Sequence, residues 1–277
     1  MPRREQSRAE HYNPGDRIRA VLVHVERLGK GPQLVLSRAS ELLVKKLLEM
    51  EVPEIYDGTV SIVTVARDAG ERSKVAVRSK DRDVDPVGAC VGMKGSRVQA
   101  VIRELRGEKI DIVQFDDDPS LYVRNSLNPA TINRVAVRHY ETREMEVIVA
   151  EDQLSLAIGK RGQNVRLASK LVGWNLDIKS EAEKKAEVEA EMARMEAASR
   201  ELSSLPGIEP DISNRLLDAG FRTVEEVSLA SMDDLTSIEG VHEEAAIAIH
   251  DAAEQALGIL REQRESEERL AAEAAAA

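Results

Sequence analysis

The chain has 277 residues, of which 32% are charged and 3% aromatic, and its formal net charge is −11. The single cysteine, Cys90, excludes an internal disulfide and a cysteine-rich metal site, fits a reducing cytosol and is expected to pack in the core. No apolar run of about 18 residues and no signal peptide is present, so we expect a soluble, cytoplasmic protein without a membrane contact.

Two strands are predicted in residues 1–38. A β-branched run over residues 17–25 follows a Pro-Gly turn, and residues 29–32 lead to a second strand over residues 33–38. This pattern resembles the last strands of the OB-type barrel of the S-one kind, whose nucleic-acid face uses earlier strands that precede this segment. We therefore expect an incomplete barrel that does not bind RNA as a full domain would.

Residues 39–117 are predicted to form one α+β unit, which we call the first copy. Leucines at helical spacing predict a helix over residues 39–49, and strands over residues 59–66 and 74–77 form a hairpin around a polar turn. An apolar-Gly-x-x-Gly loop follows at residues 91–95, and after it come a second helix and a strand.

The same order recurs in residues 118–180, the second copy. It has a short helix over residues 120–127, strands over 132–139 and 145–149, and an apolar-Gly-x-x-Gly loop at 158–162. A lone Gly-x-x-Gly is weak evidence, but two loops framed by the same elements indicate a duplicated domain.

The chemistry of the two loops indicates phosphate binding. Paired glycines let the main chain approach another backbone closely, and each loop opens a helix whose first N–H groups lack partners. Lys94 in the first loop, and Lys160 and Arg161 in the second, supply positive charge. The alternative, a tight turn with solvated cations, is weaker for the pair than for one copy.

The order helix, strand, strand, helix, Gly-x-x-Gly, helix, strand resembles the prokaryotic form of the KH domain. The resemblance implies a loop that clamps the backbone of about four nucleotides of single-stranded RNA. Scarce aromatics argue against a stacking sheet of the RRM kind. Val91 and Ile158 are candidates for the base groove, with core packing as the alternative. The expected RNA-binding residues are Val91, Gly92, Met93, Lys94, Gly95 and Arg97 in the first copy and Ile158, Gly159, Lys160, Arg161, Gly162, Gln163 and Arg166 in the second.

A barrel end followed by two KH copies, joined through residues 48–55, resembles the NusA family of bacterial transcription termination and antitermination factors over roughly residues 10–179. That resemblance implies a protein that accompanies RNA polymerase, contacts nascent RNA and tunes pausing, termination and antitermination. The family's amino-terminal polymerase-docking domain has no counterpart before Met1, which predicts a fragment or a mis-started reading frame.

Charge divides the chain. Residues 1–179 carry 30 Lys and Arg against 26 Asp and Glu, whereas residues 180–277 carry 9 against 24. The acidic second part therefore conceals a mildly basic first part, and because charge is screened over about 8 Å, the overall balance does not argue against nucleic acid.

Residues 181–203 are predicted to form a solvated linker helix, and residues 259–277 a frayed helix or disordered end. Between them, residues 204–258 contain two Gly hairpins, 205–208 and 238–241, each followed by a helix. They resemble the helix-hairpin-helix fold. Acidic residues flank both hairpins where a DNA-binding module would carry Lys or Arg, so double-stranded DNA is not expected.

For this acidic module the NusA resemblance implies contacts with protein partners, such as polymerase or antitermination factors, or with the RNA-binding face. The alternative is a structural helical cap. We expect no catalytic site, metal or cofactor, because no nucleophile, phosphate-loop or ligand motif occurs.

The sequence thus predicts a multidomain α+β protein: a partial barrel, two tandem KH domains and an all-α acidic module. Its expected function is RNA binding during transcription elongation, with RNA extending from the first loop to the second. Two rivals remain, a ribosome-assembly or RNA-processing factor and a protein-interaction scaffold with weak RNA binding.

Overall fold

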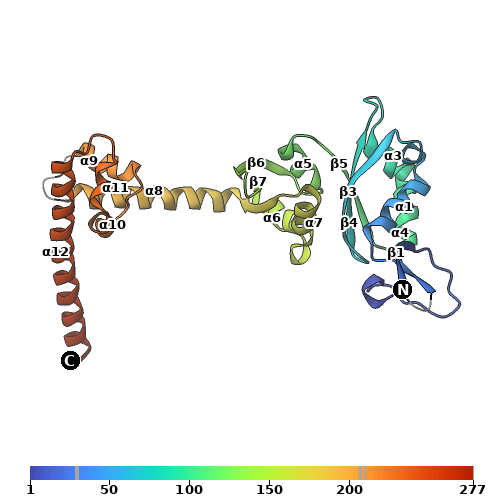
Figure 1. Ribbon diagram of the computed structural model, residues 1–277, viewed down its shortest axis with the longest axis horizontal. Helices are drawn as coiled ribbons and strands as arrows, with labels where there is room; N and C mark the ends of the chain where they lie inside the picture. The colour runs from blue at the N-terminus through green and yellow to red at the C-terminus, as the bar shows by residue number, and fades with distance from the viewer. Residues whose placement is uncertain (29–30, 206–207, 209, 277) are drawn as a thin grey trace. The chain divides into compact units, whose positions relative to one another are not determined.

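The computed structural model describes residues 1–28, 31–205, 208 and 210–276, which form two compact units, Met1–Lys184 and Lys185–Ala277 (Figure 1). The predicted turn residues Gly29 and Lys30, and Pro206, Gly207 and Glu209 of the first terminal hairpin, lie outside the described residues.

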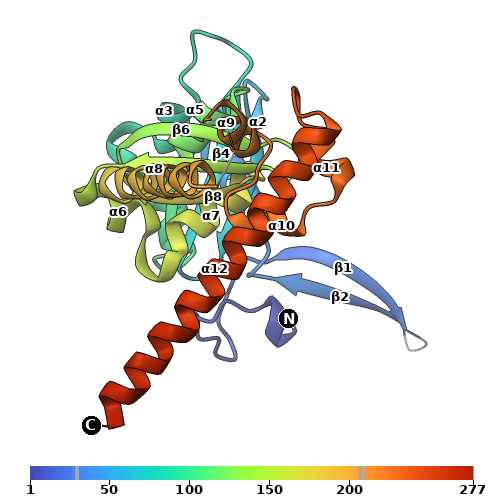
Figure 2. The same ribbon diagram turned by 90° about the vertical axis from the view of Figure 1, so that its left-hand side faces the viewer.

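The first unit begins with a short 3-10 helix, η1 (Arg3–Glu5), and an antiparallel hairpin of β1 (Val21–Leu28) and β2 (Gly31–Ser37). Figure 2 shows this hairpin extending away from the rest of its unit. Within the described residues, the two strands pair only with each other. The barrel assignment therefore stays a prediction.

The first strand starts later than the predicted Arg17. Val21 pairs with Ser37, where β2 ends, and Ser40 then accepts a hydrogen bond from Leu42 N to cap the next helix. Residues before Val21 therefore have no partner strand to extend the ladder.

The first copy contains a three-stranded sheet in the order β3-β4-β5, with β3 and β4 antiparallel and β4 and β5 parallel. Its elements are α1 (Glu41–Glu51), α2 (Pro53–Tyr56), β3 (Val60–Asp68), β4 (Arg72–Ser79), α3 (Pro86–Val91), η2 (Met93–Gly95), α4 (Ser96–Glu104) and β5 (Lys109–Gln114). This is the predicted order, with a longer second strand.

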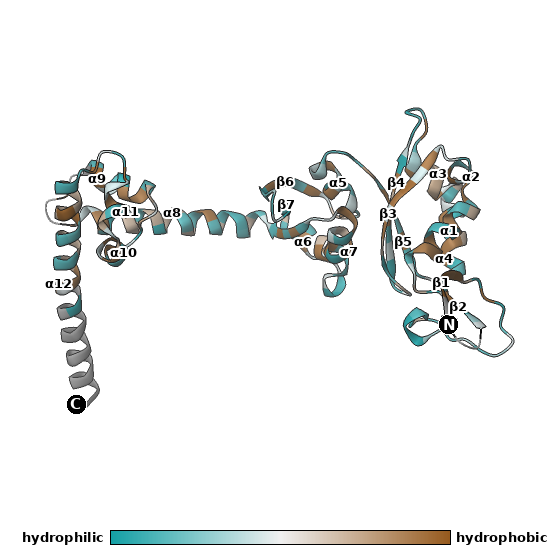
Figure 3. Cartoon of the chain, in the orientation of Figure 1, coloured by the Kyte–Doolittle hydropathy of each residue, from teal (hydrophilic) through white to brown (hydrophobic). Residues whose placement is uncertain are grey.

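Hydrophobic side chains hold the helices of the first copy on one face of this sheet. Leu47 and Leu48 of α1 share a core cluster with Val75 and Val77 of β4. Figure 3 shows the hydrophobic colour gathering where these helices and strands lie. Cys90 belongs to the same cluster, as predicted, and burial raises the pKa of its thiol to about 12.

The second copy repeats this topology, with sheet order β6-β7-β8 and the last two strands parallel. Its elements are α5 (Pro119–Ser126), β6 (Ile132–His139), β7 (Glu144–Val149), α6 (Glu151–Ile158), η3 (Lys160–Gly162), α7 (Gln163–Val172) and β8 (Asn175–Ser180).

The two copies pack against each other through the other face of the first sheet. A separate buried cluster joins the sheet of the first copy to α5 and α7 of the second. Its members are Ala66, Ala76 and Val113 from the sheet and Tyr122, Leu167 and Leu171 from the two helices. Strand β4 is buried at five consecutive positions, because alternate side chains face the first copy's own helices and the second copy. The sheet of the first copy is therefore covered on one face by its own helices and on the other by the second copy.

A buried lysine adds a polar link between the copies. Lys74 on β4 has no exposed surface, and its amine donates to Asp111 Oδ2 (3.0 Å) and to the carbonyl of Asn128 in the second copy (3.3 Å). Burial lowers the pKa of this amine, while the carboxylate of Asp111 opposes the shift.

The second unit is helical, and α8 (Glu181–Ser203) leads into it. Its other helices are α9 (Pro210–Asp218), α10 (Val224–Leu229), α11 (Met232–Thr236) and α12 (Glu243–Ala276). Only Ala198 and Leu202 are buried in α8, as expected of a solvated helix. Helix α12 continues through the predicted tail, because its Ala, Glu, Leu and Arg residues are strong helix formers.

Candidate nucleic-acid interface

The two Gly-x-x-Gly loops adopt the same backbone conformation. The φ and ψ angles are 73° and 175° at Gly92 and 75° and 171° at Gly159. The residues before the second glycines, Lys94 and Arg161, have φ of 51° and 53°, an uncommon value for residues with side chains. The duplication seen in the sequence is therefore a structural duplication of the loop itself.

The first glycine of each loop is required for space as well as torsion. A Cβ at Gly92 would lie 2.7 Å from Cγ of Arg97, and a Cβ at Gly159 would lie 2.7 Å from Cβ of Asn164. At Gly162 the nearest such contact is 4.0 Å. The side chain of Arg97 thus lies against Gly92, and both the backbone and the Cβ of Asn164 lie against Gly159.

The loops leave helix N-termini without side-chain caps. Gly95 and Gly162 are the N-cap residues of α4 and α7, and neither helix start has a side-chain cap hydrogen bond. The first N–H groups of a helix have no partner within it and lie at the positive end of its dipole. These positions suit an anionic group such as a phosphate.

The side chains at the loop tips are exposed. Met93 is 86% exposed, and Lys94, Lys160 and Arg161 are also exposed. Met93 and Lys160 occupy the same place in the two loops, so the first tip carries one cation and the second carries two. The groove candidates Val91 and Ile158 are half-buried beside the loops.

Arg97 lies against the first loop and has partners within the protein. Its Nη1 donates to the carbonyl of Ala89 (2.6 Å) and to Glu54 Oε2 (2.8 Å). The structure therefore gives this predicted RNA-binding residue a part in holding the loop.

The second copy uses a residue that sequence reasoning missed. Asn164 stands five places after Gly159, as Arg97 does after Gly92, and it is buried. Its amide donates to the carbonyls of Leu127 and Ala157, each at 3.1 Å. The shared offset from the first glycine was the available signal, but Arg and Asn differ too much for a pattern search to pair them.

Gln163 and Arg166, both predicted to bind RNA, contact the first copy. Gln163 Nε2 donates to Glu71 Oε2 (2.7 Å), and Arg166 Nη2 pairs with Asp68 Oδ2 (2.7 Å). The acceptors border the β3–β4 turn, so the start of α7 lies beside that turn. The structure brings together the loop residues of each copy and directs these two side chains to the contact between copies.

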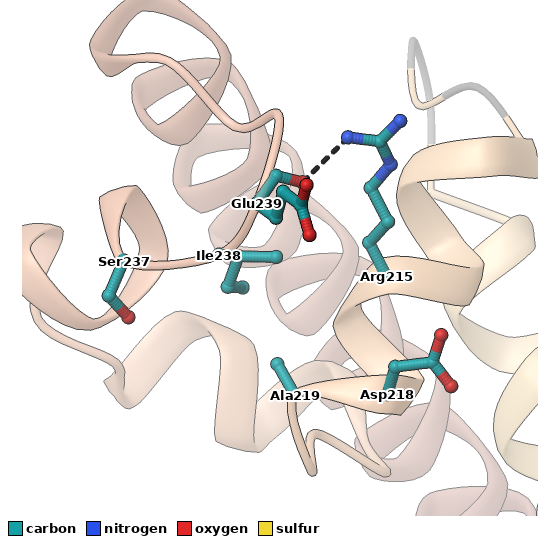
Figure 4. A pocket seen from close by; sticks show the side chains of 6 residues that line it. All are labelled: Arg215, Asp218, Ala219, Ser237, Ile238 and Glu239. Carbon is teal, nitrogen blue, oxygen red and sulfur yellow. Dashed lines mark hydrogen bonds between the residues drawn. The ribbon is translucent and has the colours of Figure 1, made fainter.

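The acidic module has one hairpin within the described residues. Arg215 Nη1 donates to the carbonyl of Glu239 at 2.6 Å, as Figure 4 shows. Arg215 also pairs with Asp211, and Arg222 donates to the carbonyls of Leu217 and Phe221. Residues 204–258 contain no other Lys or Arg, so both cations of this module have internal partners.

These features define the class of protein: two tandem KH domains followed by a helix-hairpin-helix tandem. The family models that match are a NusA-like first KH domain over residues 38–115, a NusA-like second KH domain over 119–186, and a SAM-like helix-hairpin-helix tandem over 199–255.

Three curated relatives carry the name "Transcription termination/antitermination protein NusA". The chain is 53% identical to that of Halalkalibacterium halodurans over 205 residues, covering 74% of this chain and 53% of the relative. It is 56% identical to that of Bacillus subtilis over 183 residues, covering 66% and 49%. It is 41% identical to that of Rickettsia prowazekii over 249 residues, covering 89% and 49%.

Over the matched residues the chain belongs to the NusA family. It spans about half the length of the curated relatives it matches. Among the described residues, no helix is long and apolar enough to cross a membrane.

Proposed function

We propose that this chain binds nascent single-stranded RNA through its tandem KH domains, in the cytoplasm, and thereby modulates pausing, termination and antitermination by RNA polymerase. The observation that carries the proposal is the doubled loop, with the same torsions, uncapped helix starts and exposed cations in both copies. The names of the relatives supply the transcriptional context. The mechanism is non-catalytic.

RNA extends from the first loop to the second as one strand. Support comes from the buried cluster between the copies and from the contacts of α7 with the β3–β4 turn, which hold the loops in a fixed relation. The contacting residues are Gly92, Met93, Lys94 and Gly95 in one loop and Gly159, Lys160, Arg161 and Gly162 in the other. Val91 and Ile158 border the groove for the bases.

Arg97, Gln163 and Arg166 support RNA binding indirectly. Their partners within the protein hold the first loop and the contact between copies. The acidic module serves contacts with proteins of the transcription machinery, a role supported by its charge and by its lack of a Lys or Arg without an internal partner. Co-purification of the chain with polymerase rather than with ribosomal particles separates this function from an RNA-processing role.

The test is the affinity of the chain for mixed-sequence single-stranded RNA across a salt series. We expect the logarithm of the association constant for RNA to fall linearly with the logarithm of the salt concentration. In Lys160→Gln/Arg161→Gln this slope should become shallower by about 1.4, because each neutralised phosphate of a single strand contributes about 0.7 to it. Lys185→Gln/Arg194→Gln on α8 makes the same change of net charge at exposed surface pairs and should leave the slope unchanged.

Equal slopes for the two double variants would contradict phosphate binding by the second loop. Footprinting of the complex tests the continuous strand, because protection by only one copy would exclude it.

A further inference from the structure

We propose that Tyr140 and Arg143 in the β6–β7 turn and Trp174 in the α7–β8 turn of the second copy form a platform on which a base of the bound RNA strand stacks. This platform lies outside both Gly-x-x-Gly loops. The inference rests on the proposed function, because it assigns a third contact to the same strand.

The platform combines an exposed ring with a supported one. Tyr140 is 76% exposed, although the chain has only 1 Trp, 4 Tyr and 2 Phe. Its ring lies 6.1 Å from that of Trp174, at 77°. Trp174 is half-buried and packs on the core of the second copy. An exposed tyrosine ring that packs against a tryptophan held by the core is a suitable surface for stacking of a base.

Arg143 joins the two turns that carry these rings. Its N–H donates to the carbonyl of Tyr140 (3.3 Å), and its own carbonyl accepts from the N–H of Asn175 (2.8 Å). Its guanidinium reaches the turn after α7, since Nη1 lies 3.8 Å from the position a Cβ would take at Gly173. A planar cation beside the turn that carries Trp174 can add to stacking on a base.

The internal repeat places this platform on the course of the RNA. In the first copy the equivalent turn, between β3 and β4, is contacted by Gln163 and Arg166 of the first turn of α7, the helix that follows the second loop. A strand that passes from the first loop to the second therefore ends beside the β3–β4 turn. Because the second copy repeats the topology of the first, its β6–β7 turn corresponds to the β3–β4 turn. An RNA strand that continues beyond the second loop in the same direction therefore reaches the β6–β7 turn.

Charged residues of both signs occur on the elements that carry the platform. Arg138 lies on β6, Arg143 in the β6–β7 turn and Lys170 on α7, whereas Glu141 lies in the same turn, Glu144 on β7 and Asp177 on β8. Asp177 is already paired with Arg138. A base held here is therefore bound by stacking, which depends little on salt, in contrast to phosphates at the loops.

Fluorescence and anisotropy titrations of the full chain test the platform. The probes are mixed-sequence RNAs of about 4 and about 12 nucleotides, within the range of known single-strand sites. Trp174 is the sole tryptophan, so its emission reports directly on this site. We expect the long RNA, and not the short one, to quench it.

Substitutions separate the platform from the loops. Tyr140→Leu should weaken binding of the long RNA about tenfold without changing its salt slope, and should leave the short RNA unaffected. Tyr140→Phe keeps the ring and should bind like the original chain. Lys160→Gln/Arg161→Gln should change the salt slope for both lengths.

Three results would overturn the inference. In the first, the Lys160→Gln/Arg161→Gln variant changes the salt slope, but Tyr140→Leu binds the long RNA as tightly as the original chain does. The platform would then have no role, while the proposed function would stand. If Tyr140→Leu and Tyr140→Phe weaken binding equally, the ring is not the determinant. If neither RNA binds, both the proposed function and the platform fail.

Discussion

The two glycines of each loop have different physical requirements, although a sequence pattern treats them alike. Gly159 has φ of 75° and ψ of 171°, a region almost confined to glycine, and the chain at Asn164 passes against it. Gly162 has φ of 70° and ψ of 16°, which other residues can adopt at a cost, and it has space around it. The loop conformation therefore requires glycine at the first position, whereas glycine at the second position only lowers the cost of the left-handed conformation.

Alanine at these positions should separate the two effects. We expect Gly162→Ala to lower the free energy of unfolding by about 1–2 kcal/mol, the cost of a left-handed residue. Gly159→Ala should cost more, about 3 kcal/mol or above, because strain and overlap combine. Urea unfolding followed by circular dichroism measures both, and equal midpoints for the two variants would contradict the distinction.

At the scale of elements, polar contacts attach the start of α8 to the second copy. Asn133 Nδ2 donates to Glu181 Oε1 (2.6 Å), and Lys184 Nζ donates to Glu146 Oε2 (3.0 Å). Ser180 and Glu183 form reciprocal bonds across the first turn. Polar contacts with β6, β7 and β8 thus hold the start of helix α8.

Glu146 should make this attachment sensitive to acid. Burial raises the pKa of Glu146, but hydrogen bonds from Lys184 and Arg138 outweigh burial and hold it below the ordinary value of 4.5. Its stabilising contribution is therefore complete above pH 4.5 and is lost as the pH falls through the lowered pKa.

The measurement is unfolding free energy as a function of pH for the original chain and for Glu146→Gln. We expect the variant to be less stable at neutral pH and to lose less stability on acidification. Parallel curves for the two proteins would show that Glu146 does not titrate with unfolding.

At the scale of the whole first unit, the two copies behave as one packed body because they share a buried cluster. Leu167 of α7 has no exposed surface and lies with Ala66, Ala76 and Val113 of the first copy. Truncation of such a side chain removes packing on both sides of the boundary between copies.

Leu167→Ala should lower the free energy of unfolding of this unit by about 2–5 kcal/mol. Leu156→Ala on α6 deletes the same atoms from a side chain that is 43% exposed, and it should have a much smaller effect. Denaturant melts of the two variants, and RNA affinity below the transition, check the expectation. Similar effects in both variants would mean that the cluster does not hold the copies together.

Local patterns were sufficient to predict the repeated elements and both loops. Leucines spaced along α1 and the glycine pairs act within a few residues, where a sequence is directly informative. The partners of Arg166 and Gln163 were not foreseen, because Asp68 and Glu71 lie more than 90 residues away along the chain. Exposed polar residues after a Gly loop look alike whether they meet RNA or another part of the protein.

The burial of β4 on both faces has a consequence for the order of synthesis. A growing chain releases the first copy before α7 exists, so Ala76 and its neighbours initially face water. The first copy reaches its final packing only after about sixty further residues, the stretch from β5 to the end of α7, have left the ribosome. A premature stop within that stretch would leave an uncovered apolar sheet, prone to association with other nascent chains and to capture by chaperones.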